Sequence, residues 1–436
     1  MDKSKLNVLK AGVCFLEVEV RNPVDMQDSG NFTGSGFIIS NSGSSRRLVA
    51  TCAHVAPLSS HAVNLEFNNG FRAKGKVVYT DHCHDLSFIE FFDEQNLVVH
   101  QGFEFEKDVN DFELLTLIGG NEGYKSYIAN GLVADTHILI DDRNTIGIQT
   151  SIPSAGGTSG SPIFNEDGKI VGMHIAATER CGFEMKIDII LDALDRFMMG
   201  VDKLESGITF EYENKYKLIQ AGLITEEDNL NYFSQHSKIL IIKDVDIHYE
   251  NYSHLLPGDI VLKINNKLIS NAFDAEKELN DSPNLVADIL VKRNGNLIDK
   301  KIKLKNAVDE NTATIFQWED ATFQDTNITT RRYYSIKEEG VLLSKYKPGS
   351  SFSRVGNSSS KINGGKGALI THVNGIRIKN LSDFRAVLNE TRKTSISILY
   401  YDYICNLPLK FALCDVSYES FDEQNIIDFI PKEDAA

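Results

Sequence analysis

The sequence predicts a mostly β protein in which an antiparallel β-barrel or sandwich precedes two smaller domains of mixed α and β structure. Three observations support this fold class. Short apolar segments separated by turn residues fill the first part of the chain, which is typical of antiparallel β structure. The first clear helical pattern comes only at residues 187–199. Two stretches of the second half share one order of strands and helix, which indicates an internal repeat.

The first predicted domain spans residues 1–200. Its strand-like segments are bounded by turn residues, and we place them at residues 13–20, 36–40, 47–51, 62–67, 76–79, 86–91, 114–118, 130–134 and 163–173. No helix is expected before residue 187. From there IDIILDALDRFMM places apolar residues at helical spacing and aspartates on the other face. This helix is expected to close the domain.

The second half contains two predicted domains of one type, at residues 205–306 and 313–415. LLPGDIVLKINNKLIS precedes a helical DAEKELND in the first, and GALITHVNGIRIKN precedes a helical LSDFRAVLNET in the second. A repeat of roughly a hundred residues is too long for a solenoid. The Ser/Gly-rich loop at 356–367 is expected to be mobile. The acidic tail, 416–436, is expected to be disordered or to fold back through its apolar patch, Ile426 to Ile430.

Composition and charge exclude several classes of protein. A formal net charge of -16 disfavours nucleic-acid binding, which needs a basic face. No apolar run reaches the ~18–20 residues of a membrane span, and the N-terminus lacks the long apolar core of a signal peptide. We therefore expect the cytoplasm or another reducing compartment, with secretion left open. The six cysteines lack metal or disulfide spacing, and they are Cys14, Cys52, Cys83, Cys181, Cys405 and Cys414.

The stretch AGGTSGSPIFNEDGKIVGMH, Ala155 to His174, is interpreted as a nucleophile loop. Its glycines permit backbone geometry that other residues resist. Ser159 is the candidate nucleophile, and the N–H groups of Gly157 and Ser159 could stabilise a tetrahedral oxyanion. The alternative is a glycine-rich hairpin with a surface serine. A base and an orienting acid are needed upstream to decide between them.

Two upstream motifs supply a candidate base and acid. LVATCAHV ends an apolar strand at His54, and in HCHDLSFIEF Asp85 directly precedes another apolar strand, where a buried carboxylate could orient an imidazole. The flanking His82 and His84 stay open as alternative bases. Together with Cys83 they could also suggest a metal, but side chains alternate across a strand and would not readily converge on one ion. We expect no metal and no cofactor.

The motifs TGSGFIIS, TCAHV, HDLSFIEF and GGTSGSPIFNEDGKIVGMH, in this order, resemble those of the trypsin-like serine proteases, most closely the HtrA/Deg branch. LLPGDIVLKINNKLIS and GALITHVNGIRI are similar to the core of its PDZ domains. The resemblance implies a chymotrypsin-like double β-barrel followed by two α+β PDZ-like domains. It also implies that His54 is the general base, Asp85 its orienter and Ser159 the nucleophile, with the amides of Gly157 and Ser159 as the oxyanion hole.

The sequence departs from the HtrA pattern at two places. Cys52 stands where the family usually has alanine, and a small buried cysteine is expected there. GMHIAAT places His174, Ile175 and Ala176 where a wall of the S1 pocket is expected. A Gly-x-His here resembles the glutamyl endopeptidases and the viral chymotrypsin-like main proteases. We therefore predict that His174 adds a Glu or Gln preference to the small aliphatic P1 typical of HtrA, or replaces it. The alternative is a histidine that only packs.

The resemblance implies ATP-independent endoproteolysis of unfolded or specific protein substrates by an acyl-enzyme mechanism. One alternative is a latent or inactive protease that acts as a holdase chaperone or PDZ scaffold, and another is a processing protease with few substrates. HtrA relatives usually form trimers, so a homo-trimer or larger oligomer is implied. The peptide-capturing strand of the first PDZ-like domain would be Ser206 to Tyr212, which lacks the usual Gly-hydrophobic-Gly signature. Interdomain packing or regulation is therefore favoured over ligand capture.

Overall fold

The computed structural model describes residues 3–20, 30–41, 46–92, 102–140, 144–233, 237–307, 314–355, 368–402, 407–418, 421 and 426–428. The loop predicted to be mobile, 356–367, and Cys405 lie outside these ranges. The described residues fall into two compact units, 3–307 and 314–428. Among the described residues, no helix combines the length and the apolar character needed to cross a membrane.

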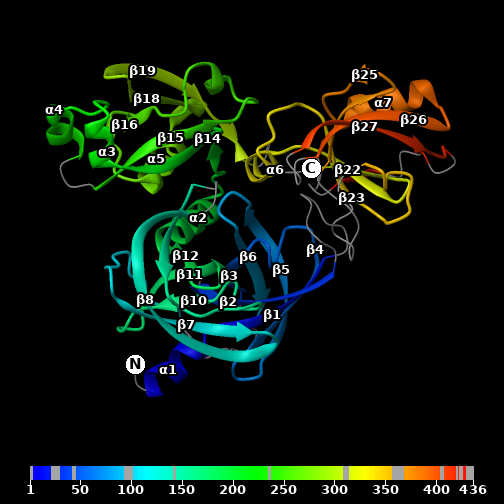
Figure 1. The fold of residues 1–436 in the computed structure, drawn as a ribbon. Helices are drawn as coiled ribbons and strands as arrows, with labels where there is room; N and C mark the ends of the chain where they lie inside the picture. Colours follow the sequence, from blue (N-terminus) through cyan, green and yellow to red (C-terminus); the bar gives the residue numbers. More distant parts are fainter. Residues whose placement is uncertain are drawn as a thin grey trace. The chain divides into compact units, whose positions relative to one another are not determined.

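The first unit begins with two closed antiparallel barrels (Figure 1). The first barrel has the strand order β1-β2-β3-β6-β5-β4, and its strands are β1 (Val13–Val20), β2 (Gly30–Asn41), β3 (Arg46–Cys52), β4 (Ser60–Phe67), β5 (Arg72–Asp81) and β6 (Leu86–Phe92). The second has the order β10-β11-β12-β9-β8-β7, with β7 (Leu114–Asn121), β8 (Tyr124–Ile140), β9 (Thr145–Thr150), β10 (Pro162–Phe164), β11 (Ile170–Ala177) and β12 (Gly182–Lys186). The predicted mostly β fold is confirmed, as two barrels.

Helices play a small part in this barrel domain. Helix α2 (Ile187–Met199) has the predicted bounds and buries its apolar face, and Gly200 ends it in the left-handed conformation. The prediction that no helix precedes residue 187 is wrong, because α1 (Lys3–Lys10) forms at the start of the chain. This helix spans barely two turns and buries Leu9, so its sequence pattern is too short to be distinctive.

The central module, residues 204–306, is a sheet with the strand order β14-β15-β16-β18-β19 and a short β13–β20 pair. Its elements are β13 (Leu204–Glu205), β14 (Ile208–Asn214), α3 (Lys215–Gln220), α4 (Glu226–Asp228), η1 (Asn229–Phe233), β15 (Lys238–Val245), η2 (Glu250–Ser253), β16 (Ile260–Ile264), β17 (Lys267–Leu268), α5 (Ala272–Asn280), η3 (Pro283–Leu285), β18 (Val286–Arg293), β19 (Asn296–Lys303) and β20 (Lys305–Asn306). The predicted hairpin at Asn294-Gly295 joins β18 to β19.

The second unit holds the C-terminal module, residues 314–428, a sheet with the order β27-β26-β24-β23-β22-β21-β28 and β25 beside β24. Its elements are β21 (Thr314–Trp318), β22 (Ala321–Asp325), α6 (Ile328–Tyr334), β23 (Val341–Tyr346), β24 (Ala368–Val373), β25 (Ile376–Arg377), α7 (Leu381–Thr391), β26 (Ser395–Asp402), β27 (Leu407–Asp415) and β28 (Ile426–Asp428). Part of the predicted tail folds back, because β28 pairs with β21.

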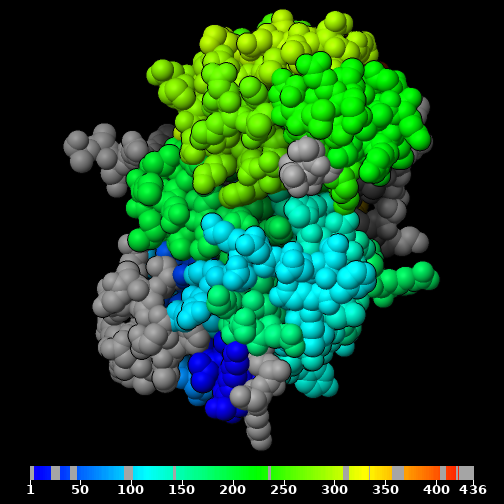
Figure 2. All heavy atoms as spheres, turned by 90° about the vertical axis from the view of Figure 1, so that its left-hand side faces the viewer, coloured from blue at the N-terminus to red at the C-terminus, as the bar shows by residue number. Residues whose placement is uncertain are grey.

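The barrel domain and the central module share one continuous hydrophobic core. Side chains at their junction add specific polar contacts. The Asn144 carboxamide, between β8 and β9, donates to the Ile208 carbonyl at 2.8 Å and accepts from the Phe210 amide at 2.7 Å. It thus occupies the free edge of β14 as a peptide group of an added strand would. Figure 2 shows the green to yellow-green central module directly against the cyan and green residues of the barrel domain.

Asn251 offers a test of the central module's stability. Its side chain is 1% exposed, donates to the carbonyls of Ser206 and Lys303 at 2.9 and 2.7 Å, and accepts from the Lys303 amide at 2.9 Å. Asn251→Ala leaves these buried groups unpaired, so we expect a loss of about 2–4 kcal/mol in the free energy of unfolding, measured by urea denaturation. Asn296→Ala, on the exposed β18–β19 hairpin, is the control and should change stability little. Equal losses in both variants would contradict this account.

Candidate active site

His54 and Asp85 meet at the ends of two neighbouring strands of the first barrel. His54 lies just beyond β3, and Asp85 directly precedes β6 with a φ of 60°. The Asp85 Oδ2 atom lies 2.6 Å from His54 Nδ1, and its Oδ1 atom accepts the His54 backbone N–H at 2.8 Å. Both carboxylate oxygens therefore hold one residue. Asp85 is buried, whereas the His54 side chain is 46% exposed.

Backbone hydrogen bonds place Ser159 beside this pair. The Ser159 carbonyl accepts the Ser35 amide of β2 at 2.8 Å, and the Gly160 amide donates to the His174 carbonyl at 2.8 Å. The same His174 carbonyl accepts the Cys52 thiol at 3.4 Å, two residues before the histidine of the pair. Within the described part of the chain, Ser159 Oγ makes no hydrogen bond. Bonds of a nucleophile to its base often tighten only in the substrate complex.

Hydrogen bonds fix the direction of two peptide groups, the one that ends in the Gly157 amide and the one that ends in the Ser159 amide. The carbonyl preceding Gly157 accepts the Glu122 amide of the β7–β8 turn at 2.6 Å, and the carbonyl preceding Ser159 accepts the Ser161 amide at 3.0 Å. A trans peptide holds its N–H opposite its carbonyl, so the amides of Gly157 and Ser159 point away from these donors. Among the described residues neither amide has an acceptor, and both can donate to a ligand.

Ser35 supports this loop through its side chain, and the sequence motifs did not predict this role. Its side chain is fully buried, donates to the Gly157 carbonyl at 2.9 Å and accepts the Gly120 amide at 2.8 Å. Gly160 leaves no room for a larger residue, because a Cβ atom there would lie 2.1 Å from the Ser35 carbonyl oxygen. Ser35 belongs to the TGSGF motif, where a small polar residue between glycines could have indicated a buried support.

His174 is 2% exposed on β11, and its ring does more than pack. Its Nδ1 atom lies 2.8 Å from Oε2 of Glu184, the residue opposite it on β12. Oε1 of the fully buried Glu184 accepts a hydrogen bond of 2.8 Å from the Thr150 hydroxyl. Of the other predicted S1 residues, Ile175 is buried and Ala176 half-buried. Glu184 was missed, because its pairing with His174 depends on the strand register.

Both ring nitrogens of His84 lie beside other side chains, so His84 is not positioned to act as the alternative base. Its Nδ1 atom lies 2.9 Å from the Thr145 hydroxyl, and its Nε2 atom lies 2.6 Å from Oε2 of Glu276 on α5 of the central module. The buried Cys83 and the half-buried His82 flank it.

A different group has donor atoms of the kind that bind metals. Cys52, His54 and Asp85 bring one such atom each to within 4.8 Å of one another. The imidazole and carboxylate are already hydrogen-bonded to each other, and the thiol donates to the His174 carbonyl. Each of the three groups therefore has a protein partner.

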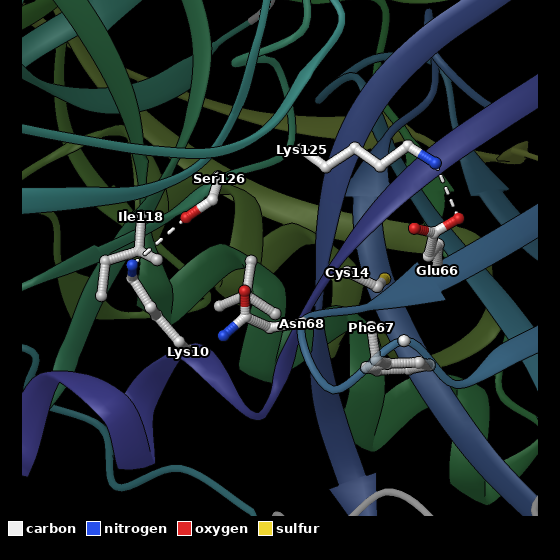
Figure 3. Close-up of a pocket in the computed structure, with 11 residues that line it drawn as sticks. Lys10, Cys14, Glu66, Phe67, Asn68, Ile118, Lys125 and Ser126 are labelled. Carbon is white, nitrogen blue, oxygen red and sulfur yellow. Dashed lines mark hydrogen bonds and ion pairs between the residues drawn. The ribbon is translucent and has the colours of Figure 1, made fainter.

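A pocket of about 130 Å³ lies where α1, β1 and β4 meet β7 and β8 (Figure 3). Lys10 Nζ lies 3.2 Å from the Ser126 hydroxyl there, and Lys125 Nζ lies 2.7 Å from a carboxylate oxygen of Glu66. Its lining, as far as the chain is described, includes none of the site residues predicted from the sequence. The pocket is therefore separate from the candidate active site.

Comparison with known proteins agrees with this geometry. The family model described as a trypsin-like peptidase domain matches residues 34–173, the stretch that contains His54, Asp85 and Ser159. Among curated proteins, the Pro-apoptotic serine protease NMA111 of Debaryomyces hansenii is 23% identical over 360 residues, covering 77% of this chain and 35% of the relative. A solved structure, "HtrA-type protease AlgW with tripeptide", superposes with a TM-score of 0.51 at 17% identity, covering 69% of this chain and 96% of that one. The chain therefore contains a trypsin-like peptidase domain and is similar to HtrA-type serine proteases.

The curated relatives are much longer than this chain. The PDZ domain-containing protein C23G3.12c of Schizosaccharomyces pombe is 24% identical over 354 residues, which cover 75% of this chain and 34% of the relative. The chain spans about a third of the length of the curated relatives it matches.

Ser35→Ala tests the support that Ser35 gives to the nucleophile loop. The change leaves the Gly157 carbonyl and the Gly120 amide unpaired, so we expect a stability loss of about 1–3 kcal/mol. We also expect Ser159 to react roughly tenfold more slowly with a fluorophosphonate probe, because the oxyanion donors lose their fixed position. Ser87→Ala removes an equally buried hydroxyl that bonds Thr80 and serves as the control. Equal labelling rates for the two variants would contradict the assigned role.

Proposed function

We propose that this chain is an HtrA-type, ATP-independent serine endopeptidase that cleaves unfolded or specific protein substrates. The observation that carries the proposal is the pair of hydrogen bonds, 2.6 and 2.8 Å long, that the buried Asp85 carboxylate accepts from His54. A carboxylate in this position fixes the imidazole tautomer in which Nδ1 carries the proton and Nε2 is the nitrogen that accepts one during the reaction. The exposed His54 ring and the nearby Ser159 are what a general base and its nucleophile require.

The reaction follows from these roles. His54 Nε2 removes the proton of Ser159 Oγ as the oxygen attacks the substrate carbonyl, and Asp85 stabilises the imidazolium. The oxyanion is held by the amides of Gly157 and Ser159. His54 then protonates the leaving amine, and a water activated by the same base hydrolyses the acyl-enzyme. The water supplies the hydroxyl group of the released acid, and its other proton returns to Ser159 Oγ through His54.

Ser159→Ala should abolish hydrolysis of an unfolded protein such as casein while leaving the unfolding temperature near that of the parent. The rate of casein hydrolysis by the variant should be at least roughly 10³-fold below that of the parent, because the nucleophile is lost. A fluorophosphonate probe should label the parent at Ser159 and leave the variant unlabelled. A parent that binds unfolded protein without labelling or hydrolysis would instead indicate a latent holdase or scaffold. Undiminished cleavage by the variant would rule out Ser159.

We further propose that His174 selects Glu or Gln at P1. Its Nδ1 atom is committed to Glu184, so only Nε2 can meet a substrate side chain. The proposal requires that Nε2 carries a proton. Nε2–H then donates to a P1 carboxylate or carboxamide oxygen. A site built to donate a hydrogen bond discriminates strongly against substrates that cannot accept one.

Glu184→Gln tests this preference with little change of shape. In the parent, peptides with P1 Glu or Gln should have kcat/KM values roughly tenfold or more above matched P1 Ala peptides. In the variant this ratio should collapse, because a glutamine carboxamide no longer supplies the carboxylate that orients the His174 ring through Nδ1. Glu179→Gln, on the exposed turn between β11 and β12, is the control. A strong P1 Ala or Val preference in the parent would overturn the proposal.

The proposal also covers the cellular compartment and the role of the central module. We propose a reducing compartment, because none of the five cysteines in the described ranges forms a disulfide and four of them are buried. We also propose that the central module serves mainly to pack against the barrel domain and regulate it, and not to capture peptides. The edge of β14, which includes the predicted capture strand, is already bonded by Asn144.

A further inference from the structure

A buried cluster of charges joins the barrel domain to the central module. Lys203 Nζ, in the segment between them, lies 3.1 Å from an Asp81 carboxylate oxygen, 3.5 Å from Glu205 and 3.8 Å from Glu276. Glu276 also approaches the His84 ring to 2.6 Å. None of these side chains is more than 13% exposed. Ions removed from water are stable only when they are paired in this way.

Asp81 shapes the turn that contains Asp85. It ends β5, and its Oδ1 atom accepts the backbone amides of Cys83 and His84 at 2.9 and 3.1 Å. Asp85 follows at once, in the left-handed region that costs a non-glycine residue conformational energy. The position of the Asp85 carboxylate therefore depends on a turn built around the Asp81 side chain.

The charge states of the central pair keep it intact over a wide pH range. Burial alone would raise the pKa of Asp81, but Lys203, His84 and the backbone amide of His84 outweigh it and hold that pKa well below its usual range. Burial would lower the pKa of Lys203, but Asp81, Glu276 and Glu205 raise it well above its usual range. Both groups therefore stay charged around neutral pH.

The central module reaches the same turn by a second route. His84 bridges Glu276 of α5 and Thr145 at the start of β9, and the preceding residue, Asn144, bonds the edge of β14. The turn before Asp85 is thus bonded directly by α5 of the central module and by Lys203 in the segment that leads into it, and it is connected to β14 only through Thr145 and Asn144.

We propose that Lys203 and Glu276 are positioning residues for catalysis, which hold Asp85 in register with His54 through Asp81 and His84. The inference rests on the proposed function of Ser159. Neither residue touches the reacting atoms. Their effect is to make an active barrel domain depend on a docked central module. A shift of about 1 Å at a catalytic group can cost roughly 100-fold in rate.

Lys203→Met and Glu276→Gln, made in the full chain, test the proposal. We expect kcat for an unfolded casein substrate to fall roughly 10- to 100-fold in the first variant and about tenfold in the second, with KM little changed. Lys203→Arg should restore most of the rate, because it keeps the charge. The controls are Lys301→Met and Glu278→Gln, which disrupt ion pairs whose lysines are exposed, the second of them on the same helix.

Two readouts separate positioning from a general loss of structure. The acidic limb of the kcat/KM profile should shift, and the low-field proton resonance of the His54 Nδ1–H bonded to Asp85 should move or broaden. If Lys203→Met fails to fold, Glu276→Gln carries the test. Variants that melt like their controls and keep the parent's pH profile and proton resonance would overturn the proposal. A parent without hydrolysis whose resonance still responds to Glu276→Gln would refute the proposed function but support the coupling.

Discussion

The two hydrogen bonds between the Asp85 carboxylate and His54 are the constraint on which the candidate site depends. A single hydrogen bond would leave the imidazole free to pivot, whereas the second, to the backbone amide, fixes carboxylate and chain together. Asp85 reaches this position from a left-handed conformation that is unfavourable for an isolated residue. The surrounding turn must stabilise that conformation, and the buried hydrogen bonds that Asp81 accepts from the backbone of the turn do so.

The nucleophile loop, by contrast, is held in place mainly by main-chain hydrogen bonds. Carbonyls on both sides of Ser159 accept amides from other elements, and one buried hydroxyl, Ser35, joins the loop to β2. Glycine is required where the backbone crosses Ser35 at close range, at Gly160. Within the described part of the chain these contacts leave the amides of Gly157 and Ser159 unpaired, so the loop is held without using the groups that its proposed chemistry needs.

Sequence patterns predicted the parts of this protein that are set by local periodicity. Helix α2 and strand β1 have their predicted bounds, because their apolar residues repeat at the helical or strand period. Strands β9 and β12 were missed. β12 (GFEMK) carries the buried Glu184, which reads as a surface residue until its partner is known. The sequence singled out His174 as a candidate S1 residue, but it could not identify Glu184 as the carboxylate partner of His174.

The sequence by itself determined the order of the motifs, the mostly β class and the residue types of a serine protease, because these depend on neighbours along the chain. Only the tertiary structure decided which histidine faces Asp85, since His54 and His84 are both candidates from their spacing. It also placed Lys203 and Glu276 beside the turn before Asp85. Such contacts join residues more than a hundred positions apart. Their geometry is fixed by barrel closure and by the shared core, not by any local pattern.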